Sequence, residues 1–470
     1  MRGSSRRSGG GTPGSRRCVL MVCDFFFPQV GGVEGHIYAL AQRLLARGTR
    51  VVVMTHAYGD RGGVRYLTDG LKVYYVPRAP WLMDSDTLPT FFGGFRILRA
   101  ILIRERVDVV HGHQTLSTMA QEAVLHAGTM GLPTVFTDHS LFGFSDVASI
   151  LANKLQKFTL SDCDAVICVS HTSKENTVLR SCVPPSRVFV VPNAVDSAQF
   201  CPNLDAHPCL RQPGRGRKRV SRDGELIVVV LSRLAYRKGS GLLSLVIPLA
   251  CERFPGVRFL IGGDGPARGM LEERIEELGL EDRVRFAGFV PHHCAAEFIS
   301  QGDIFLNTSL TEAFCMAVVE AAAVGLPVVS TAVGGVPEVL PPHMIVLARP
   351  EVESLVDGLA EAQKRVGAIS DLKQHRIEQH RVVASMYSWE DVAERTETVY
   401  EHITVGKGRR TGGLLRRMER MYPCGVIAGK IFCAVAVVDD FYWRALECFF
   451  PASDIEPAAE IPENYRTFPN

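Results

Sequence analysis

The chain has 470 residues, of which 46% are hydrophobic and 22% charged, a globular composition in a chain too long for one ordinary core. Its 52 Lys and Arg residues nearly balance its 50 Asp and Glu residues, so the net charge gives no reason to expect a nucleic-acid partner. The 13 cysteines are scattered and form no C-x-x-C pair. This pattern argues against a zinc ribbon or a disulfide framework and favours a reducing compartment.

The chain opens with a segment, residues 1–16, made mostly of Gly, Ser and Arg, without the apolar core of a secretory signal. We expect a disordered leader there. An apolar run at 18–28 then predicts a buried strand, and a helical pattern follows that ends at Gly48. RVVVMTH, at 50–56, predicts a second buried strand. Strand, glycine loop, helix and strand make a βαβ unit, so the sheet should be parallel. The alternation continues and predicts a doubly wound, Rossmann-like domain over 17–196.

Residues 197–224 are rich in Pro, Gly and Arg and show no periodicity. They predict a linker with a basic insertion, in preference to an arm that binds nucleic acid. The α/β pattern restarts at residue 225 and gives a second doubly wound domain to about residue 387. With a closing helix that begins near Ser388, we assign 225–420 to the C-terminal domain. Two such domains facing a cleft predict ligands at the carboxyl ends of the strands.

The C-terminal part of the chain is apolar from 424 to 438 apart from Lys430, but four charged residues follow within ten positions. A spanning helix needs about 20 mostly apolar residues. Hydropathy alone therefore favours an amphipathic or interfacial helix over a spanning one. We predict a membrane segment at 421–450 and a tail at 451–470.

Two features could hold a diphosphate. Gly31–Gly32 lies between the first predicted strand and its helix, where unpaired N–H groups and the helix dipole favour an anion; the alternative is a tight turn. Arg233 and Lys238 follow the first strand of the second domain, and two cations there suit a diphosphate without a metal. The alternative is an exposed basic pair. No acidic D-x-D pair stands beside these residues to suggest a metal.

Two glutamates interrupt an apolar stretch predicted to be helical. Glu320 lies eight residues after Glu312, which would place the two side chains some 80° apart on one helix, bordering one cleft. Buried carboxylates need partners, and sugar and ribose hydroxyls are suitable. The alternative is a helix-capping acid and a structural salt bridge.

Three histidines are expected at strand ends facing the cleft. They are His111, His113 and His139. A histidine is more often a packed core residue than a catalytic one, and both interpretations stay open.

Together these stretches resemble the GT-B glycosyltransferases of retaining family 4, and within them the catalytic subunits of phosphatidylinositol N-acetylglucosaminyltransferase (the PIG-A type). The most specific matches are HAYG…RYLTDGLKVYY and TDHSLFGF, and the resemblance runs from about residue 18 to 342. SRLAYRKG and the E-x7-E pattern are shared with many family-4 enzymes.

The resemblance implies transfer of N-acetylglucosamine from UDP-N-acetylglucosamine to phosphatidylinositol, the first step of glycosylphosphatidylinositol anchor synthesis, with retained configuration and no metal. It implies that Arg233 and Lys238 hold the UDP diphosphate, assisted by Gly31 and Gly32. Glu312 would contact the donor sugar, Glu320 the ribose, and His139 would lie near the reacting centre. It also implies partner subunits and a place at the endoplasmic reticulum membrane, with the catalytic domains on the cytoplasmic face.

The sequence departs from the family pattern at two acceptor-side positions, where Gly35 replaces a serine and HGHQT stands at 111–115. The charged tail also differs from the family's membrane anchor. Other functions remain open: a family-4 transferase with another acceptor, a non-catalytic scaffold subunit, or an oxidoreductase, although the dinucleotide fingerprint is missing.

Overall fold

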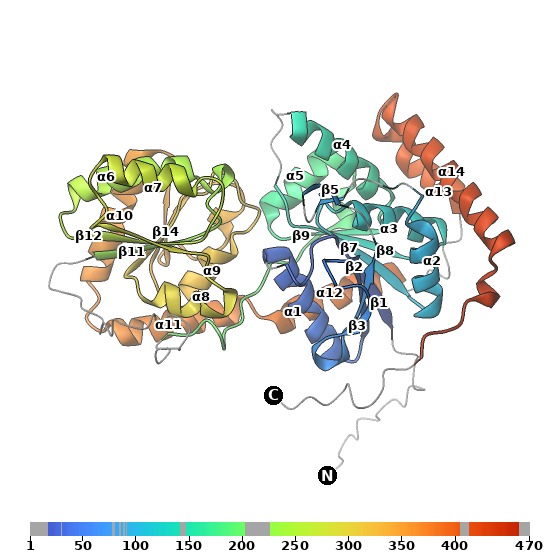
Figure 1. The fold of residues 1–470 in the computed structure, drawn as a ribbon, viewed down its shortest axis with the longest axis horizontal. Helices are drawn as coiled ribbons and strands as arrows, with labels where there is room; N and C mark the ends of the chain where they lie inside the picture. Colours follow the sequence, from blue (N-terminus) through green and yellow to red (C-terminus); the bar gives the residue numbers. More distant parts are fainter. Residues whose placement is uncertain are drawn as a thin grey trace, which may run out of the picture.

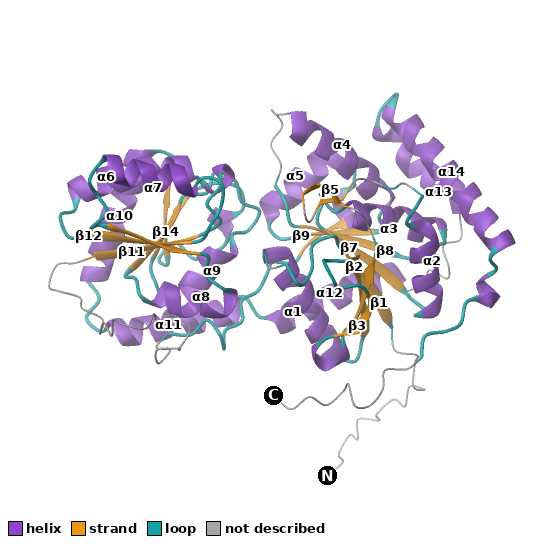
Figure 2. Ribbon diagram, viewed as in Figure 1, coloured by secondary structure: helices purple, strands orange, loops and turns teal. Residues whose placement is uncertain are grey.

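Two parallel sheets, each covered by helices on both faces, form the two lobes of the molecule (Figures 1 and 2). The computed structural model describes residues 17–29, 31–77, 80–83, 86–87, 90, 92–141, 147–202, 226–404 and 413–459. The predicted leader and most of the predicted basic insertion lie outside the described residues.

The first sheet has the strand order β10-β9-β8-β7-β1-β2-β4-β3. Only the β3–β4 pairing is antiparallel, and every residue of β1 is buried, as its apolar sequence predicts. The strands are β1 (Cys18–Val22), β2 (Arg50–His56), β3 (Gly63–Tyr66), β4 (Lys72–Val76), β7 (Val109–His113), β8 (Thr134–Asp138), β9 (Ala165–Cys168) and β10 (Val188–Val190). The helices of this lobe are α1 (Gly32–Ala46), α2 (Phe95–Arg104), α3 (Thr118–Thr129), α4 (Val147–Asp162) and α5 (His171–Ser181). A small pair, β5 (Pro80–Met83) and β6 (Asp86–Thr87), lies outside the sheet.

The second sheet is entirely parallel, with the order β13-β12-β11-β14-β15-β16. The chain order reverses between β11 and β14, where doubly wound sheets open a crevice for ligands. The strands are β11 (Leu226–Leu231), β12 (Val257–Gly262), β13 (Val284–Gly288), β14 (Ile304–Asn307), β15 (Val328–Thr331) and β16 (Ile345–Ala348). The helices are α6 (Ser240–Arg253), α7 (Arg268–Glu277), α8 (His292–Ser300), α9 (Met316–Ala323), α10 (Val352–Gly367) and α11 (Leu372–Met386). The predicted GT-B-like pair of parallel-sheet domains is confirmed.

The closing helix α12 (Trp389–Thr404) crosses back to the first lobe and packs against α1. This position differs from the prediction, which assigned residues 225–420 to the C-terminal domain. The Tyr400 hydroxyl lies 2.7 Å from His111 Nδ1, and Arg47 pairs with Glu397 at 2.7 Å. The apolar face of α12 joins the same core cluster as β1 and β2. Periodicity shows that such a face exists but not which lobe buries it.

The C-terminal segment forms a helical hairpin, α13 (Gly413–Met421) and α14 (Ala428–Phe449), that packs on α3 and α4 (Figure 1, right). Asp439 is fully buried and lies 2.7 Å from His126 Nδ1. Arg417 is buried too, and its Nε donates to Asp162 at 2.8 Å. Among the described helices, none is long and apolar enough to cross a membrane, so the structure gives no support to the predicted membrane segment at 421–450.

The buried ion pair makes the hairpin an integral part of the first lobe. Replacing Arg417 with Leu removes a cation that pairs with the buried Asp162 carboxylate, and we expect the free energy of unfolding to fall by about 3–5 kcal/mol. The matched control is Arg444→Leu, since Arg444 forms an exposed pair with Asp440 and its loss should cost less than about 1 kcal/mol. Urea unfolding of the purified chain compares the two, and equal small losses would show that the pair does not hold the hairpin.

Candidate functional site

The candidate site lies at the carboxyl ends of β11 and β14, where the order of the second sheet reverses. Lys238 ends a 3-10 turn (Tyr236–Lys238) after β11, and Glu312 stands in the loop after β14. Lys238 Nζ lies 2.5 Å from Glu312 Oε1. Ser309 Oγ donates to the same oxygen at 2.8 Å. The crevice thus brings together two residues that are 74 positions apart in the chain.

Gly239 allows the two loops to come this close. Its φ is +74°, in the left-handed region, and a Cβ there would lie 1.8 Å from the carbonyl oxygen of Thr308. Thr308 Oγ1 in turn donates to the carbonyl of Lys238 at 3.1 Å. The glycine is therefore required by the contact that places Lys238 against Glu312.

The charge of Lys238 is stabilised by this contact. Burial alone would lower the pKa of Lys238, but the Glu312 carboxylate outweighs burial and raises it. The ammonium therefore keeps its charge although it is partly buried. A cation held in this way can bind an anionic ligand.

Glu312 and Glu320 are not related by helical geometry, which corrects our expectation. Helix α9 begins only at Met316, because Cys315 has φ +70° and interrupts the helical path. Glu312 therefore belongs to the preceding loop. Glu320 is buried in α9 and lies 3.4 Å from His292 Nε2, and the hydrogen bond to Glu320 raises the pKa of His292. The structure thus gives the two acids different partners, Lys238 for Glu312 and His292 for Glu320.

The first lobe presents the predicted glycine pair at the start of α1. Gly31 is the N-cap residue and Gly32 the first helical residue, and both are exposed. A Cβ on Gly31 would lie 2.5 Å from Glu34 Oε2, so the glycine makes room for that side chain. Burial raises the pKa of Glu34, and the nearby charge of Arg233 opposes the rise. Arg233 of the second lobe is therefore close enough to act on the glycine loop of the first.

The two lobes also meet at the loops behind the site. Glu338 of the second lobe accepts hydrogen bonds from the backbone N–H groups of His171 and Thr172, at 2.7 and 2.8 Å. These groups begin α5, whose dipole favours a carboxylate. Gly334 lies between the Glu312 carbonyl and the Leu141 side chain, where a Cβ would be 2.0 and 2.7 Å from their atoms. The loop of Glu312 is thus packed against the segment that follows His139.

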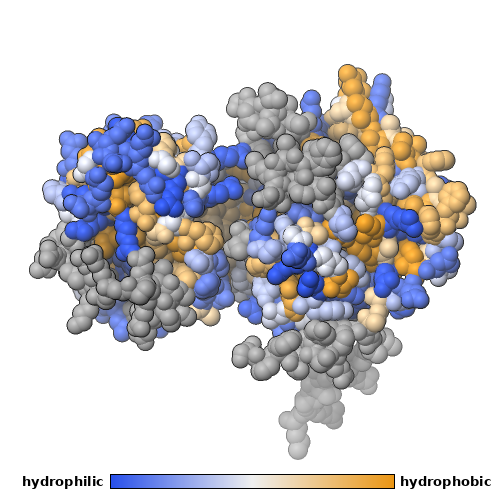
Figure 3. Space-filling view, viewed as in Figure 1, coloured by the Kyte–Doolittle hydropathy of each residue, from blue (hydrophilic) through white to orange (hydrophobic). Residues whose placement is uncertain are grey.

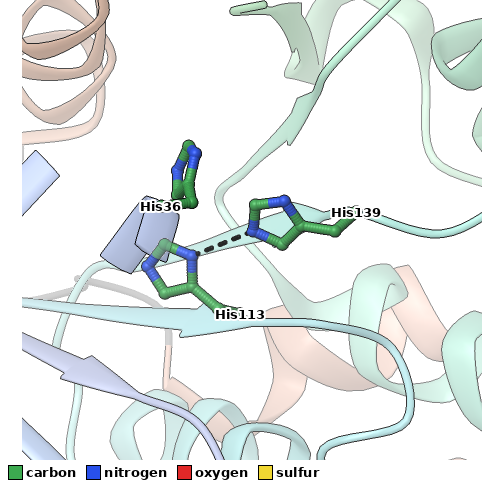
Figure 4. Close-up of side chains that lie close together, drawn as sticks. All are labelled: His36, His113 and His139. Carbon is green, nitrogen blue, oxygen red and sulfur yellow. Dashed lines mark hydrogen bonds between the residues drawn. The ribbon is translucent and has the colours of Figure 1, made fainter. Parts of the chain in front are cut away.

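Three histidines from different elements of the first lobe gather beside this segment (Figure 4). His36 is on the first turn of α1, His113 ends β7 and His139 follows β8. One ring nitrogen of each lies within 4.8 Å of those of the others, a spacing that a metal ion could use. His113 Nδ1 is 3.4 Å from His139 Nε2. Burial lowers the pKa of all three, that of His36 to about 4, so the rings are neutral near pH 7.

His111 is not one of the three clustered histidines, and its ring nitrogens contact other residues. Its Nδ1 is 2.7 Å from the Tyr400 hydroxyl and its Nε2 is 2.7 Å from Thr137 Oγ1. Nδ1 therefore joins β7 to α12, and Nε2 joins β7 to the neighbouring strand β8.

Sequence reasoning missed His36 and His292. His36 has a visible signal, since it is a polar residue on the otherwise apolar face of the first helix, one turn after the glycine pair. His292 has none, because nothing in HHCAAEF indicates that α8 approaches Glu320 of α9.

Models of known protein families match segments of both lobes. The model described as PIGA (GPI anchor biosynthesis) matches residues 56–146, and the model of glycosyl transferases group 1 matches residues 216–379. The chain is 52% identical to a phosphatidylinositol N-acetylglucosaminyltransferase subunit of Arabidopsis thaliana, over 94% of both chains. It is 47% identical to the corresponding subunit of Homo sapiens, over 94% of this chain and 87% of that protein.

Solved structures show the same fold at low identity. Sucrose-phosphate synthase from Thermosynechococcus elongatus matches with a TM-score of 0.68 and 20% identity, over 83% of this chain and all of that one. The Anabaena HepE protein in complex with UDP matches with a TM-score of 0.60 and 17% identity, over 82% of this chain and 100% of that one.

The close approach at Gly239 can be tested with two alanine variants. Gly239→Ala forces a side chain onto the Thr308 carbonyl in a left-handed conformation, and we expect it to lower the free energy of unfolding by about 1–3 kcal/mol. Gly241→Ala, two residues on in α6, meets no atom within 4 Å and should raise it by about 0.5–1 kcal/mol. Chemical unfolding measures both, and a neutral Gly239→Ala would contradict the described packing.

Proposed function

Because the chain belongs to the PIG-A family of phosphatidylinositol N-acetylglucosaminyltransferase subunits, we propose that its cleft transfers N-acetylglucosamine from UDP-N-acetylglucosamine to phosphatidylinositol. The chain is a glycosyltransferase of glycosylphosphatidylinositol anchor biosynthesis, and the transfer is the first step of that synthesis. Its relatives are named as subunits, so the chain acts together with other subunits. The observation that best supports the donor site is the Lys238–Glu312 pair in the crevice between β11 and β14.

In this proposal the donor diphosphate lies between the lobes. Arg233 and Lys238 bind it from the second lobe, and the N–H groups at Gly31–Gly32 face it from the first. Lys238 is already charged and held by Glu312, so it needs little rearrangement to donate to a phosphate oxygen. Glu312 can then accept from a hydroxyl of the donor sugar, and Glu320 from the ribose.

The same cations serve the chemistry of the transfer. As the bond between the sugar carbon and the phosphate oxygen breaks, negative charge develops on the departing diphosphate, next to Arg233 and Lys238. The acceptor oxygen forms the new bond to the sugar carbon, and its proton passes to the departing phosphate. Attack from the face that the diphosphate leaves retains the configuration. The cations supply the stabilisation for which other enzymes use a metal, and no metal is required by this scheme.

The acceptor is a membrane lipid, so the first lobe must reach a bilayer. The outward face of α14 and the turn before it is mostly apolar, with Lys430 and Arg444 also exposed, and Figure 3 shows hydrophobic side chains gathered over this hairpin at the upper right. The exposed residues are Val426, Ile427, Ile431, Val437, Val438, Phe441 and Phe449. The inward face is held by Asp439 and by Glu447, which pairs with Arg99 at 2.7 Å. We propose that the hairpin lies in the membrane interface, on the cytoplasmic face of the endoplasmic reticulum.

The donor site is tested by a lipid-product assay. Membranes that contain the full chain and its partner subunits, given labelled UDP-N-acetylglucosamine and phosphatidylinositol, should form a chloroform-soluble labelled lipid. Glu312→Gln keeps the shape but removes the charge that holds Lys238, and should lower kcat by roughly 100-fold.

Glu272→Gln is the matched control for this assay, because Glu272 pairs with Arg268 on the exposed face of α7, and its activity should be unchanged. Full activity of Glu312→Gln would favour a scaffold subunit. Product only with another acceptor would favour a different family-4 transferase.

The membrane surface is tested by flotation on liposomes of phosphatidylcholine and phosphatidylinositol. Ile431→Glu with Phe441→Glu places two charges on the exposed face of α14 and should abolish flotation while leaving the thermal unfolding temperature unchanged. Leu278→Glu, at an exposed leucine of the second lobe, is the control and should float as the unaltered chain does. Flotation of the double variant would contradict the proposed surface.

A further inference from the structure

His113 has one ring nitrogen that is buried and has no hydrogen-bond partner among the described residues. This atom is Nε2, and the whole side chain is inaccessible to solvent. The other nitrogen, Nδ1, lies 3.4 Å from His139 Nε2 (Figure 4). His139 is partly exposed, and its second ring nitrogen points away from His113 in this view.

A neutral imidazole carries one N–H and one lone pair, so a single proton lies between His113 Nδ1 and His139 Nε2. If His139 held that proton, the proton of His113 would have to be on Nε2, as a buried donor without an acceptor. If His113 holds it, Nε2 is an unpaired lone pair. A buried unpaired donor is rarer in proteins than an under-used acceptor. The second arrangement is therefore favoured, and it leaves the proton of His139 on Nδ1.

We propose that His113 is a positioning residue that donates from Nδ1 to His139 Nε2 and so fixes His139 as a hydrogen-bond donor, through Nδ1–H, to a ligand oxygen in the cleft. In this tautomer His139 has no free lone pair and does not act as a base. The inference deepens the proposed transfer reaction, on which its kinetic readout rests, but the tautomer itself is measured without substrate.

The same buried nitrogen argues against the use of the three-histidine cluster by a metal ion. A metal bound through His113 Nδ1 would force the proton onto Nε2. Metal-bound histidines almost always donate from the other nitrogen to a carboxylate, carbonyl or water. Nε2 of His113 has no such acceptor among the described residues, and Nδ1 of His36 also has no partner there.

The tautomers can be measured by two-bond 1H–15N correlation spectra of the full chain labelled with 15N-histidine. The signals of His139 are assigned by their loss in His139→Asn. We expect His139 and His113 each to be protonated at Nδ1. Protonation of His139 at Nε2 would overturn the proposal, as would a stoichiometric metal ion in the purified chain that His113→Leu removes.

Two substitutions at His113 separate positioning from packing. His113→Asn keeps a donor near the place of Nδ1, so the tautomer of His139 should be unchanged. His113→Leu removes the donor, and His139 should then show both tautomers. An unchanged His139 tautomer in His113→Leu would overturn the proposal.

The kinetic consequence is measured in membranes with the partner subunits. His113→Leu should lower kcat by at least about tenfold with little change in the KM for the donor, and His113→Asn should restore most of the activity. His343→Asn, at an exposed histidine of the second lobe, is the control. Equal losses for His113→Asn and His113→Leu would show a merely structural role and overturn the proposal.

Absence of lipid product from the unaltered chain would instead contradict the proposed function, while the tautomer spectra would still decide this inference.

Discussion

The ion pair between Lys238 and Glu312 is the contact on which the proposed donor half of the site depends. A partly buried ammonium gains stability from a compensating charge, and the Glu312 carboxylate supplies that charge. The pair exists because Gly239 lets the turn after β11 touch the Thr308 carbonyl after β14. Sheet topology, one glycine and two charges therefore fix the position at which a phosphate can bind.

Sequence patterns predicted the two sheets, and the positions of the proposed phosphate-binding residues at their edges, for a simple reason. Continuous apolar runs that alternate with segments of helical periodicity predict buried parallel strands connected by helices. The loops at the carboxyl ends of those strands carry Gly31, Arg233 and Lys238. The relation between Glu312 and Glu320 could not be predicted, because the left-handed Cys315 delays the start of helix α9 to Met316. Nor could the lobe that buries α12, since an apolar face does not specify its partner.

In the C-terminal hairpin, too, the hydropathy of the sequence does not show which residues are buried or what they contact. In the sequence Asp439 is a charge that interrupts an apolar stretch, whereas in the structure it is buried against His126 of α3. Helix α4 connects the hairpin to the segment of His139: Asp162 at its end pairs with Arg417 of the hairpin, and Gln156 donates to Asp138, the neighbour of His139. The proposed membrane surface and the acceptor side of the cleft are thus joined by one helix.

The most direct test of the donor site is a structure of the full chain with UDP bound. We expect phosphate oxygens about 3 Å from the side-chain nitrogens of Arg233 and Lys238, with Glu320 in contact with the ribose. A bound UDP whose diphosphate contacts neither cation would contradict this expectation.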